Sequence, residues 1–207
     1  MTRLNSIQTF RSGKRASKAP GCMAPRSRGF TLVELLVVMS CAGILLGLAV
    51  PSMRQFMQNQ RLSSAAASLI TALNYARSEA VKEDLPTTVG VGGVEVCASA
   101  DGLNCDPAGN WNNGWIVLSA ANAVPLQVFG PLAAGMTVSQ NSAMPAVIFQ
   151  SSGMLPTGAL VVPQLEFKFC DARGAAYARE VEVNATGYVA GSPTPGFDVA
   201  QVALACP

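Results

Sequence analysis

The chain has 207 residues, which is enough for one domain with a sizeable core, and half of them are hydrophobic whereas 13% are charged. The sequence contains no histidine, and this excludes Ser-His-Asp and Cys-His catalysis and every metal site that needs an imidazole ligand. From residue 30 onward there are seven bases against 12 acids, a mildly acidic balance that argues against strong non-specific attraction to nucleic acid.

The N-terminal segment has the pattern of a targeting and orientation signal. Residues 1–29 carry seven basic groups and no acid, and a 21-residue apolar run follows them from Phe30 to Val50. As a helix this run would be about 30 Å long, the hydrocarbon thickness of a bilayer, so it predicts a membrane-spanning helix with the basic residues on the cytoplasmic side. The alternative is the core of a cleaved secretory signal, which is usually shorter and ends at a small-residue site.

Glu34 is the single charge in this apolar run. A carboxylate inside a membrane is costly, so we expect it to face a partner or to serve a function. If the chain were cut between Gly29 and Phe30, the new α-amino group of Phe30 would be a cation at a similar depth. Glu34 of a neighbouring molecule could then pair with it.

Beyond Pro51 the helical pattern continues to about Asp84. Pro51 lacks a backbone donor, so we expect a kink or break there. Gly43 and Gly47 form a small-xxx-small pair that permits close packing of helices. An apolar stripe at three- and four-residue spacing marks the buried face of the outer half. The stripe consists of Leu62, Ala66, Leu69, Leu73, Ala76 and Ala80.

After Pro86 the sequence changes to short β-rich runs separated by turns. The predicted fold class is therefore α+β, a long N-terminal helix packed on a C-terminal antiparallel β-sheet domain. The expected segments are a leader at 1–29, a membrane helix at 30–50, an outer helix at 51–85 and a β-rich domain at 86–207. The strand candidates are Thr87–Val91, Val94–Cys97, Trp115–Leu118, Leu126–Phe129, Met136–Val138, Val147–Gln150, Leu165–Cys170, Ala178–Val183 and Gly187–Val189.

Residues 28–37, Arg-Gly-Phe-Thr-Leu-Val-Glu-Leu-Leu-Val, resemble the class III signal of type IV pilins and pseudopilins. The resemblance implies that prepilin peptidase cleaves after Gly29 on the cytoplasmic face and methylates the new N-terminal Phe30. It also implies that Glu34 pairs with the N-terminus of a neighbouring subunit during assembly, and Pro51 falls where many family helices carry a proline. The leader is longer than is usual in these families, so we expect Met23 to be the true start.

The resemblance extends into the GspH/FimT family of type IV pilin-like proteins. It is carried by residues 65–82 with their Ala-Arg-Ser-Glu-Ala segment, by the Trp-Asn-Asn-Gly-Trp turn at 111–115, and by residues 149–153 and 169–174. For the two tryptophans we expect a packed hairpin. For the charged pair within the helix, Arg77 and Glu79, we expect a solvent-exposed face.

The family resemblance implies a structural role, and three alternatives remain open within it. The first is a minor type IV pilin of the FimT kind, the second a GspH-like pseudopilin of type II secretion, and the third a DNA-binding pilin. The implied partners are prepilin peptidase, other pilins, the inner-membrane assembly platform and the lipid bilayer. The implied location is the inner membrane, crossed once, with the C-terminal domain in the periplasm.

DNA binding is doubtful on the residues themselves. FimT-like proteins with that role carry a Gly-Arg-x-Arg motif, and the corresponding stretch here, Gly187–Ala190, has no arginine. Lys168, Arg173 and Arg179 are the candidate basic residues, although acids lie among them. No spacing suggests a catalytic nucleophile with its base, and no glycine loop suggests a cofactor, so we expect neither an enzyme nor a bound cofactor.

Four cysteines lie in the β-rich part and allow three pairings. We favour Cys97–Cys105, which would close the turn at 101–104, and Cys170–Cys206, which would tie the C-terminal tail to a strand. Disulfides fit an oxidising compartment. The alternative is a zinc site, but the spacings lack paired C-x-x-C knuckles.

Overall fold

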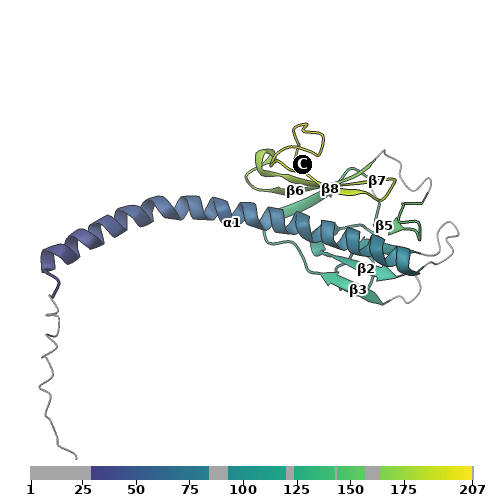
Figure 1. The fold of residues 1–207 in the computed structure, drawn as a ribbon, viewed down its shortest axis with the longest axis horizontal. Coiled ribbons are helices and arrows are strands. Elements are labelled where there is room, and N and C mark those ends of the chain that lie inside the picture. Colours follow the sequence, from purple (N-terminus) through teal and green to yellow (C-terminus); the bar gives the residue numbers. More distant parts are fainter. Residues whose placement is uncertain (1–28, 84–92, 120–123, 143, 157–163, 207) are drawn as a thin grey trace, which may run out of the picture. The chain divides into compact units, whose positions relative to one another are not determined.

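The structure, a computed structural model, describes residues 29–83, 93–119, 124–142, 144–156 and 164–206 (Figure 1). The chain divides into two compact units, Met1–Leu46 and Gly47–Pro207. Within the described residues, the first unit contains the start of helix α1, and the second contains the remainder of α1 and all the strands.

Helix α1 spans Leu32–Glu83. Thr31 caps its start, since the amide of Glu34 donates to Thr31 Oγ1 at 3.2 Å and the amide of Leu35 donates to the Thr31 carbonyl at 3.1 Å. The helix continues through Pro51, so the expected break is absent. A proline removes one backbone donor, and this local loss leaves the hydrogen bonds of the turns on both sides in place.

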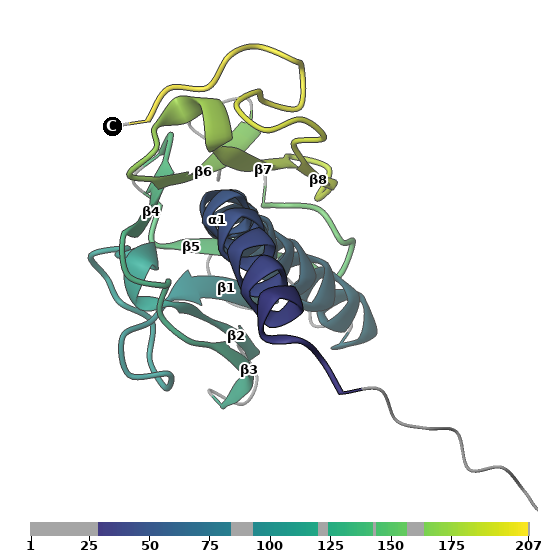
Figure 2. The same cartoon turned by 90° about the vertical axis from the view of Figure 1, so that its left-hand side faces the viewer.

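The apolar stripe of α1 forms one side of the main core. All six predicted stripe residues are at most 7% exposed, as predicted, and Ala72 joins them. They pack with buried residues from both sheets, so a single face of the helix holds the second unit together. Figure 2, viewed along this part of α1, shows one sheet on either side of it.

In the described part of the chain, eight strands form two four-stranded sheets in which every pairing is antiparallel. The first sheet has the order β3-β2-β1-β5 and consists of β1 (Val94–Ala98), β2 (Trp115–Ser119), β3 (Pro125–Phe129) and β5 (Ala146–Phe149). The second has the order β4-β6-β7-β8 and consists of β4 (Met136–Gln140), β6 (Gln164–Asp171), β7 (Arg179–Asn184) and β8 (Val189–Gly191).

The α+β prediction is confirmed, and the structure refines it by dividing the strands between two sheets. The predicted strand Thr87–Val91 lies outside the described residues. The last predicted strand begins later than expected because Gly187, with φ of +74°, lies in a turn. The side chain of Asn184 organises this turn by accepting hydrogen bonds from the amides of Thr186 and Tyr188, both at 3.1 Å.

The Trp-Asn-Asn-Gly-Trp segment lies in the connection between β1 and β2, which pair as an antiparallel hairpin, and both tryptophans are buried, as expected. Its tryptophans also contact the second sheet. Trp111 lies in a 3-10 turn, η1 (Trp111–Asn113), and contacts Phe167 of the second sheet edge to face at 4.9 Å. Trp115 begins β2, stacks on Phe129 and meets Phe169 edge to face. A second short turn, η2 (Ala175–Tyr177), follows β6.

Candidate functional site

The predicted cleavage and assembly residues lie at the start of α1. Phe30 is 79% exposed, and Gly29 and Glu34 are exposed as well. Glu34 occupies the first helical turn, where the helix dipole favours a carboxylate. Thr31 and Glu34 also have the spacing of a capping box. Glu34 therefore has a local role at the helix start, and its exposed side chain is open to a partner.

The apolar run is exposed along its length within the first unit. Eleven large hydrophobic side chains there are each more than half exposed. By length and composition, α1 contains a stretch that can cross a membrane, with a mean hydropathy of 2.4 and none of it buried. Such a surface requires lipid or other helices as its surroundings. Nothing lies within 4 Å of the Cβ positions that Gly43 and Gly47 would have, so the face they form is open to close packing.

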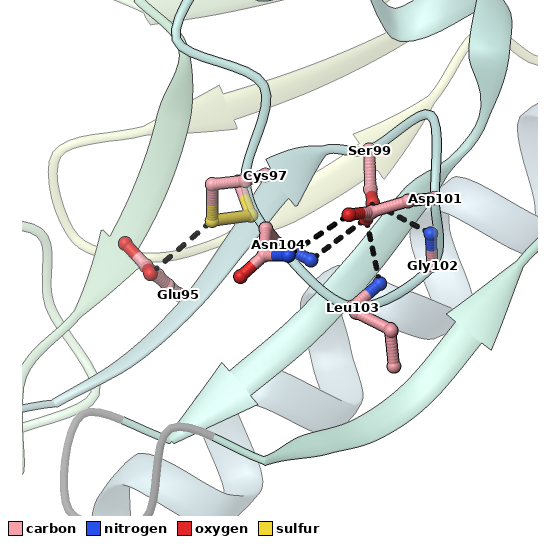
Figure 3. The surroundings of a disulfide bond; sticks show 8 residues. Glu95, Cys97, Ser99, Asp101, Gly102, Leu103 and Asn104 are labelled. Atoms are coloured by element: carbon pink, nitrogen blue, oxygen red, sulfur yellow. Dashed lines mark hydrogen bonds between the residues drawn. A yellow bond between two sulfur atoms is a disulfide. The ribbon is translucent and has the colours of Figure 1, made fainter.

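Both cysteine pairs of the favoured connectivity are joined in the structure. Cys97–Cys105 closes a loop that Asp101 organises (Figure 3). The Asp101 carboxylate accepts hydrogen bonds from the amide and side chain of Asn104 and from the amide of Leu103, each at 2.8 Å. These bonds, with those from Asn104 as the largest cause, hold the pKa of Asp101 well below its usual range.

The zinc alternative finds no support at this loop. Glu95, Cys97 and Cys105 converge, but sulfur atoms joined in a disulfide have no thiolate to offer a metal. Glu95 Oε1 lies 3.3 Å from Cys105 Sγ, and a hydrogen bond there needs a proton on the carboxyl group because a disulfide sulfur carries none. Burial raises the pKa of Glu95, which favours that protonated form.

The second disulfide, Cys170–Cys206, ties the C-terminal segment to β6. Cys170, Ala178 and Leu204 form a small separate core beside it. The bond closes a sequence separation of 36 residues, against 8 for Cys97–Cys105. Because stabilisation by a disulfide grows with the length of the loop that it closes, Cys170–Cys206 is expected to contribute more to stability.

Replacing both Cys170 and Cys206 with serine is expected to lower the free energy of unfolding by about 2–4 kcal/mol. Urea denaturation followed by tryptophan fluorescence would measure the change. The paired replacement of Cys97 and Cys105 is the matched control and should have the smaller effect. Equal stability of the Cys170/Cys206 variant and the parent would show that the tail is held by its other contacts.

The three candidate DNA-binding residues do not form one patch. Lys168 pairs with Glu166 at 3.1 Å and Arg173 pairs with Asp171 at 2.7 Å. Side chains alternate between the two faces of a strand, and the register places Arg179 opposite Phe169 on the core-facing side, away from Lys168. The outer face of the second sheet also carries three acids, namely Glu166, Glu180 and Glu182.

Arg173 has a structural role instead. Its guanidinium donates to the Asp171 carboxylate and to Asn59 Oδ1 of α1, the latter at 2.6 Å, and it lies 4.2 Å from the ring centre of Tyr177. Burial acts to raise the pKa of Asp171, but the hydrogen bonds from Arg173 outweigh it and lower the pKa. Arg173 thus fixes the turn after β6 against the helix.

Arg77 is the residue whose role the sequence interpretation missed. Its Nε donates to the Gly153 carbonyl at 3.0 Å and its guanidinium also donates to the Thr186 carbonyl at 3.3 Å. It therefore links α1 to the turn after β5 and to the turn between β7 and β8, which belong to different sheets. The expectation of a solvent-exposed face is wrong for Arg77. Glu79 is half-buried as well, and its carboxylate pairs with the exposed Lys82 at 2.6 Å.

Comparison with known proteins decides the family. The sequence model described as type II transport protein GspH matches residues 65–187, more than half of the chain. The chain belongs to the GspH family. A second model, the prokaryotic N-terminal methylation motif, matches residues 24–50 and so includes the predicted cleavage site. This GspH family member is thus a membrane-anchored protein of the type IV minor pilin or pseudopilin class.

Two curated pilins match the GspH-family chain over short segments. The type IV major pilin protein PilA of Myxococcus xanthus is 42% identical over 45 residues, which is 22% of this chain and 20% of that protein. The pilin-like protein PilA1 of Thermus thermophilus is 44% identical over 57 residues, which is 28% of this chain and 35% of that protein. The chain therefore spans about a third or less of the length of these two curated relatives.

The likeness to a solved structure covers the fold more fully. The crystal structure of the type IV minor pilin FimU from Pseudomonas aeruginosa matches with a TM-score of 0.50 and 25% identity, over 67% of this chain and 92% of that one. The shared architecture is one long helix packed on two antiparallel sheets.

Proposed function

We propose that this GspH-family protein is a minor type IV pilin of the FimT kind. Prepilin peptidase cleaves it between Gly29 and Phe30 and methylates Phe30, and the mature subunit joins other pilins in a helical filament or primes its assembly. Its role is structural rather than enzymatic. The observation that carries the proposal is the match to the minor pilin FimU over 92% of that chain.

Before assembly, the protein crosses the inner membrane once through α1. The seven basic groups of residues 1–29 favour a cytoplasmic N-terminus, which leaves the sheets in the periplasm. Two disulfides are consistent with that oxidising compartment. The boundaries that we propose are a leader at 1–29, with Met23 as its true start, a core helix at 30–50, an outer helix at 51–85 and a β-rich domain at 86–207. An inner-membrane platform then lifts the subunit into the filament.

Glu34 is the residue on which assembly depends. Its carboxylate pairs with the α-amino group of a neighbouring subunit's Phe30, and Pro51 shapes the helix for packing. We expect Glu34→Ala to be processed normally, with Phe30 as its N-terminal residue by sequencing, and to be absent from sheared filaments. The reason is that an unpaired α-ammonium group would remain in the apolar filament core.

Thr31→Ala is the matched control, because it removes the cap of the same helix turn and keeps the charge of Glu34. We expect this variant to enter filaments. If Thr31→Ala and Glu34→Ala failed equally, Glu34 would act only as a helix-capping residue. Recovery of mature protein that still carries Gly29 would contradict the proposed cleavage.

A pseudopilin of type II secretion is the second candidate, since the family model that matches is described by that transport role. The two proposals differ in the phenotype of a deletion. A strain lacking a minor pilin loses surface filaments and twitching motility while it still secretes exoproteins. Loss of exoprotein secretion with normal filaments would identify a pseudopilin instead.

A further inference from the structure

A groove runs between α1 and the loop that follows β3. It has a volume of about 480 Å³ and lies between residues 56–68 of α1 and residues 130–136, with Trp115 as a further lining residue. Most of the lining is apolar, including Phe56, Met57 and Leu132. Grooves of this size and composition hold a ligand or the apolar part of a partner.

The loop on one side of the groove has an unusual composition. Residues 130–135 read Gly-Pro-Leu-Ala-Ala-Gly and contain no polar side chain, and all except Leu132 are exposed. Loops that face water are normally rich in polar residues. An exposed apolar loop beside an apolar groove indicates a surface that meets something less polar than water.

The helix on the other side combines exposed apolar side chains with unpaired positive charge. Met53 is 56% exposed, Phe56 61% and Met57 46%. Arg54 and Arg61 lie seven residues apart and so share one helix face. Among the described residues neither has an acidic partner within 4 Å, and no acid occurs on α1 between Glu34 and Glu79.

The place of these residues along α1 determines what they meet while the protein is anchored. The apolar run ends at Val50 and the helix continues without interruption. At about 1.5 Å per residue, Met53 to Met57 lie about 5–10 Å beyond it. The headgroup layer on each side of a bilayer is about 5–8 Å deep. Met53 therefore falls at the headgroup level, and the Cα atoms of Phe56 and Met57 lie just beyond its outer edge. Because side chains of a helix tilt toward its N-terminus, those of Phe56 and Met57 point back toward this level, and the long, flexible side chain of Arg61 extends in the same direction.

We propose that a collar, formed by Met53, Arg54, Phe56, Met57 and Arg61 with the loop at 130–135, docks on the anionic phospholipid surface of the membrane in which α1 is anchored. The apolar side chains enter the boundary between headgroups and acyl chains, and the two arginines bind lipid phosphates. The second unit is thereby held against the bilayer until assembly extracts the subunit. This inference rests on the membrane-anchored pilin proposed above.

Tryptophan fluorescence in vesicles tests the collar. The chain has two tryptophans, and Trp111→Phe leaves Trp115 of the groove as the reporter. The full chain is reconstituted into vesicles of phosphatidylcholine, or of phosphatidylcholine mixed with phosphatidylglycerol, each with brominated acyl chains. We expect stronger quenching of Trp115 in the anionic vesicles and weaker quenching at high salt. In Arg54→Gln/Arg61→Gln the ratio of docked to undocked protein should fall about tenfold or more, since each arginine contributes near an anionic surface.

The control is Lys82→Gln, which removes one positive charge at the far end of α1 and should leave the quenching unchanged. Unaltered thermal unfolding of each variant shows that its fold is intact.

Equal quenching in neutral and anionic vesicles, or undiminished quenching in the double arginine variant, would overturn the proposal. Efficient cross-linking of the Ala133→Cys variant to a second pilin, while Trp115 stays unquenched, would overturn it as well, because the collar would then be a subunit contact. The vesicle experiment needs neither cleavage nor filaments, so its failure is separable from a failure of the pilin assignment.

Discussion

Replacing Arg77 with alanine is expected to lower the free energy of unfolding by about 2–4 kcal/mol. Two charge-assisted hydrogen bonds are lost, and the carbonyl of the buried Gly153 is left without its donor. Arg77→Lys should recover only part of the stability, because a single ammonium group cannot reproduce the planar fork that reaches both turns. Urea denaturation of the full chain in detergent, followed by the fluorescence of the two tryptophans, measures these differences.

Gly187 provides an independent check on the same contact. Its φ is +74°, and a Cβ there would collide with the Gly153 carbonyl that Arg77 binds and would approach Arg77 Nε to 3.3 Å. Gly187→Ala should therefore be destabilising on its own. Because both substitutions disturb one contact, the double variant should lose less stability than the two single losses combined.

Lys82→Ala is the control for charge removal from α1. Lys82 is exposed and pairs with Glu79 only at the helix surface, where solvent screens the ion pair, so we expect little or no loss of stability. Full additivity of the Arg77 and Gly187 substitutions, or an Arg77 effect no larger than that of Lys82, would show that Arg77 does not link the two turns.

Local pattern was sufficient to predict much of this fold. The stripe from Leu62 to Ala80 predicts a buried helical face because one side of a helix repeats every three or four residues, and strands such as Val94–Cys97 are short apolar runs between turns. The Cys97–Cys105 pair is also local, since its turn lies between the two cysteines.

Features that depend on contacts distant in sequence were not predictable in this way. No local spacing predicts that the strands divide into two sheets. Local spacing also cannot predict the two carbonyl acceptors of Arg77, because they lie 76 and 109 residues away in the sequence. The positions of the candidate basic residues depend on such distant contacts as well. Lys168 and Arg179 are close in sequence, but the register of β6 and β7 places them on opposite faces. At the candidate assembly site, the motif points to Glu34, whereas the partner that we propose for it belongs to another molecule and so leaves no signal in this sequence.

Glu180 is expected to make stability depend on pH near neutrality. This carboxyl group on β7 is 1% exposed, beneath the C-terminal segment. Its Oε2 accepts a hydrogen bond from the amide of Val199 at 3.2 Å, and its Oε1 has no partner among the described residues. Burial, reinforced by the nearby charge of Glu166, raises the pKa of Glu180 to about 7.

The groups around Glu180 mostly act in the same direction. Asp198 on the C-terminal segment raises the pKa further, while Lys168 on β6 and the Val199 amide lower it. Glu182, its neighbour on β7, also has a raised pKa because of burial. Lys168 does not neutralise Glu180, since its ammonium group is bound to Glu166.

Because the pKa of Glu180 is higher in the folded chain than in the unfolded chain, the folded chain keeps a proton on Glu180 at pH values where the unfolded chain has released it. The free energy of unfolding should therefore fall as pH rises from about 4.5, the ordinary value, to about 7. The shift corresponds to about 3 kcal/mol over that interval. The lowered pKa values of Asp101 and Asp171 act in the acid range below it, whereas the raised pKa values of Glu95 and Glu182 add to the same decline.

Glu180→Gln should abolish most of this decline, because glutamine keeps an acceptor for the Val199 amide and never carries the buried charge. At pH 8 the variant should be more stable than the parent, and near pH 4.5 the two should be similar. Glu79→Gln removes a carboxylate from the surface of α1 and should leave the shape of the profile as in the parent. Parallel curves for Glu180→Gln and the parent between pH 4.5 and 8 would mean that Glu180 is already ionised in the fold, with its charge compensated by water beneath the C-terminal segment.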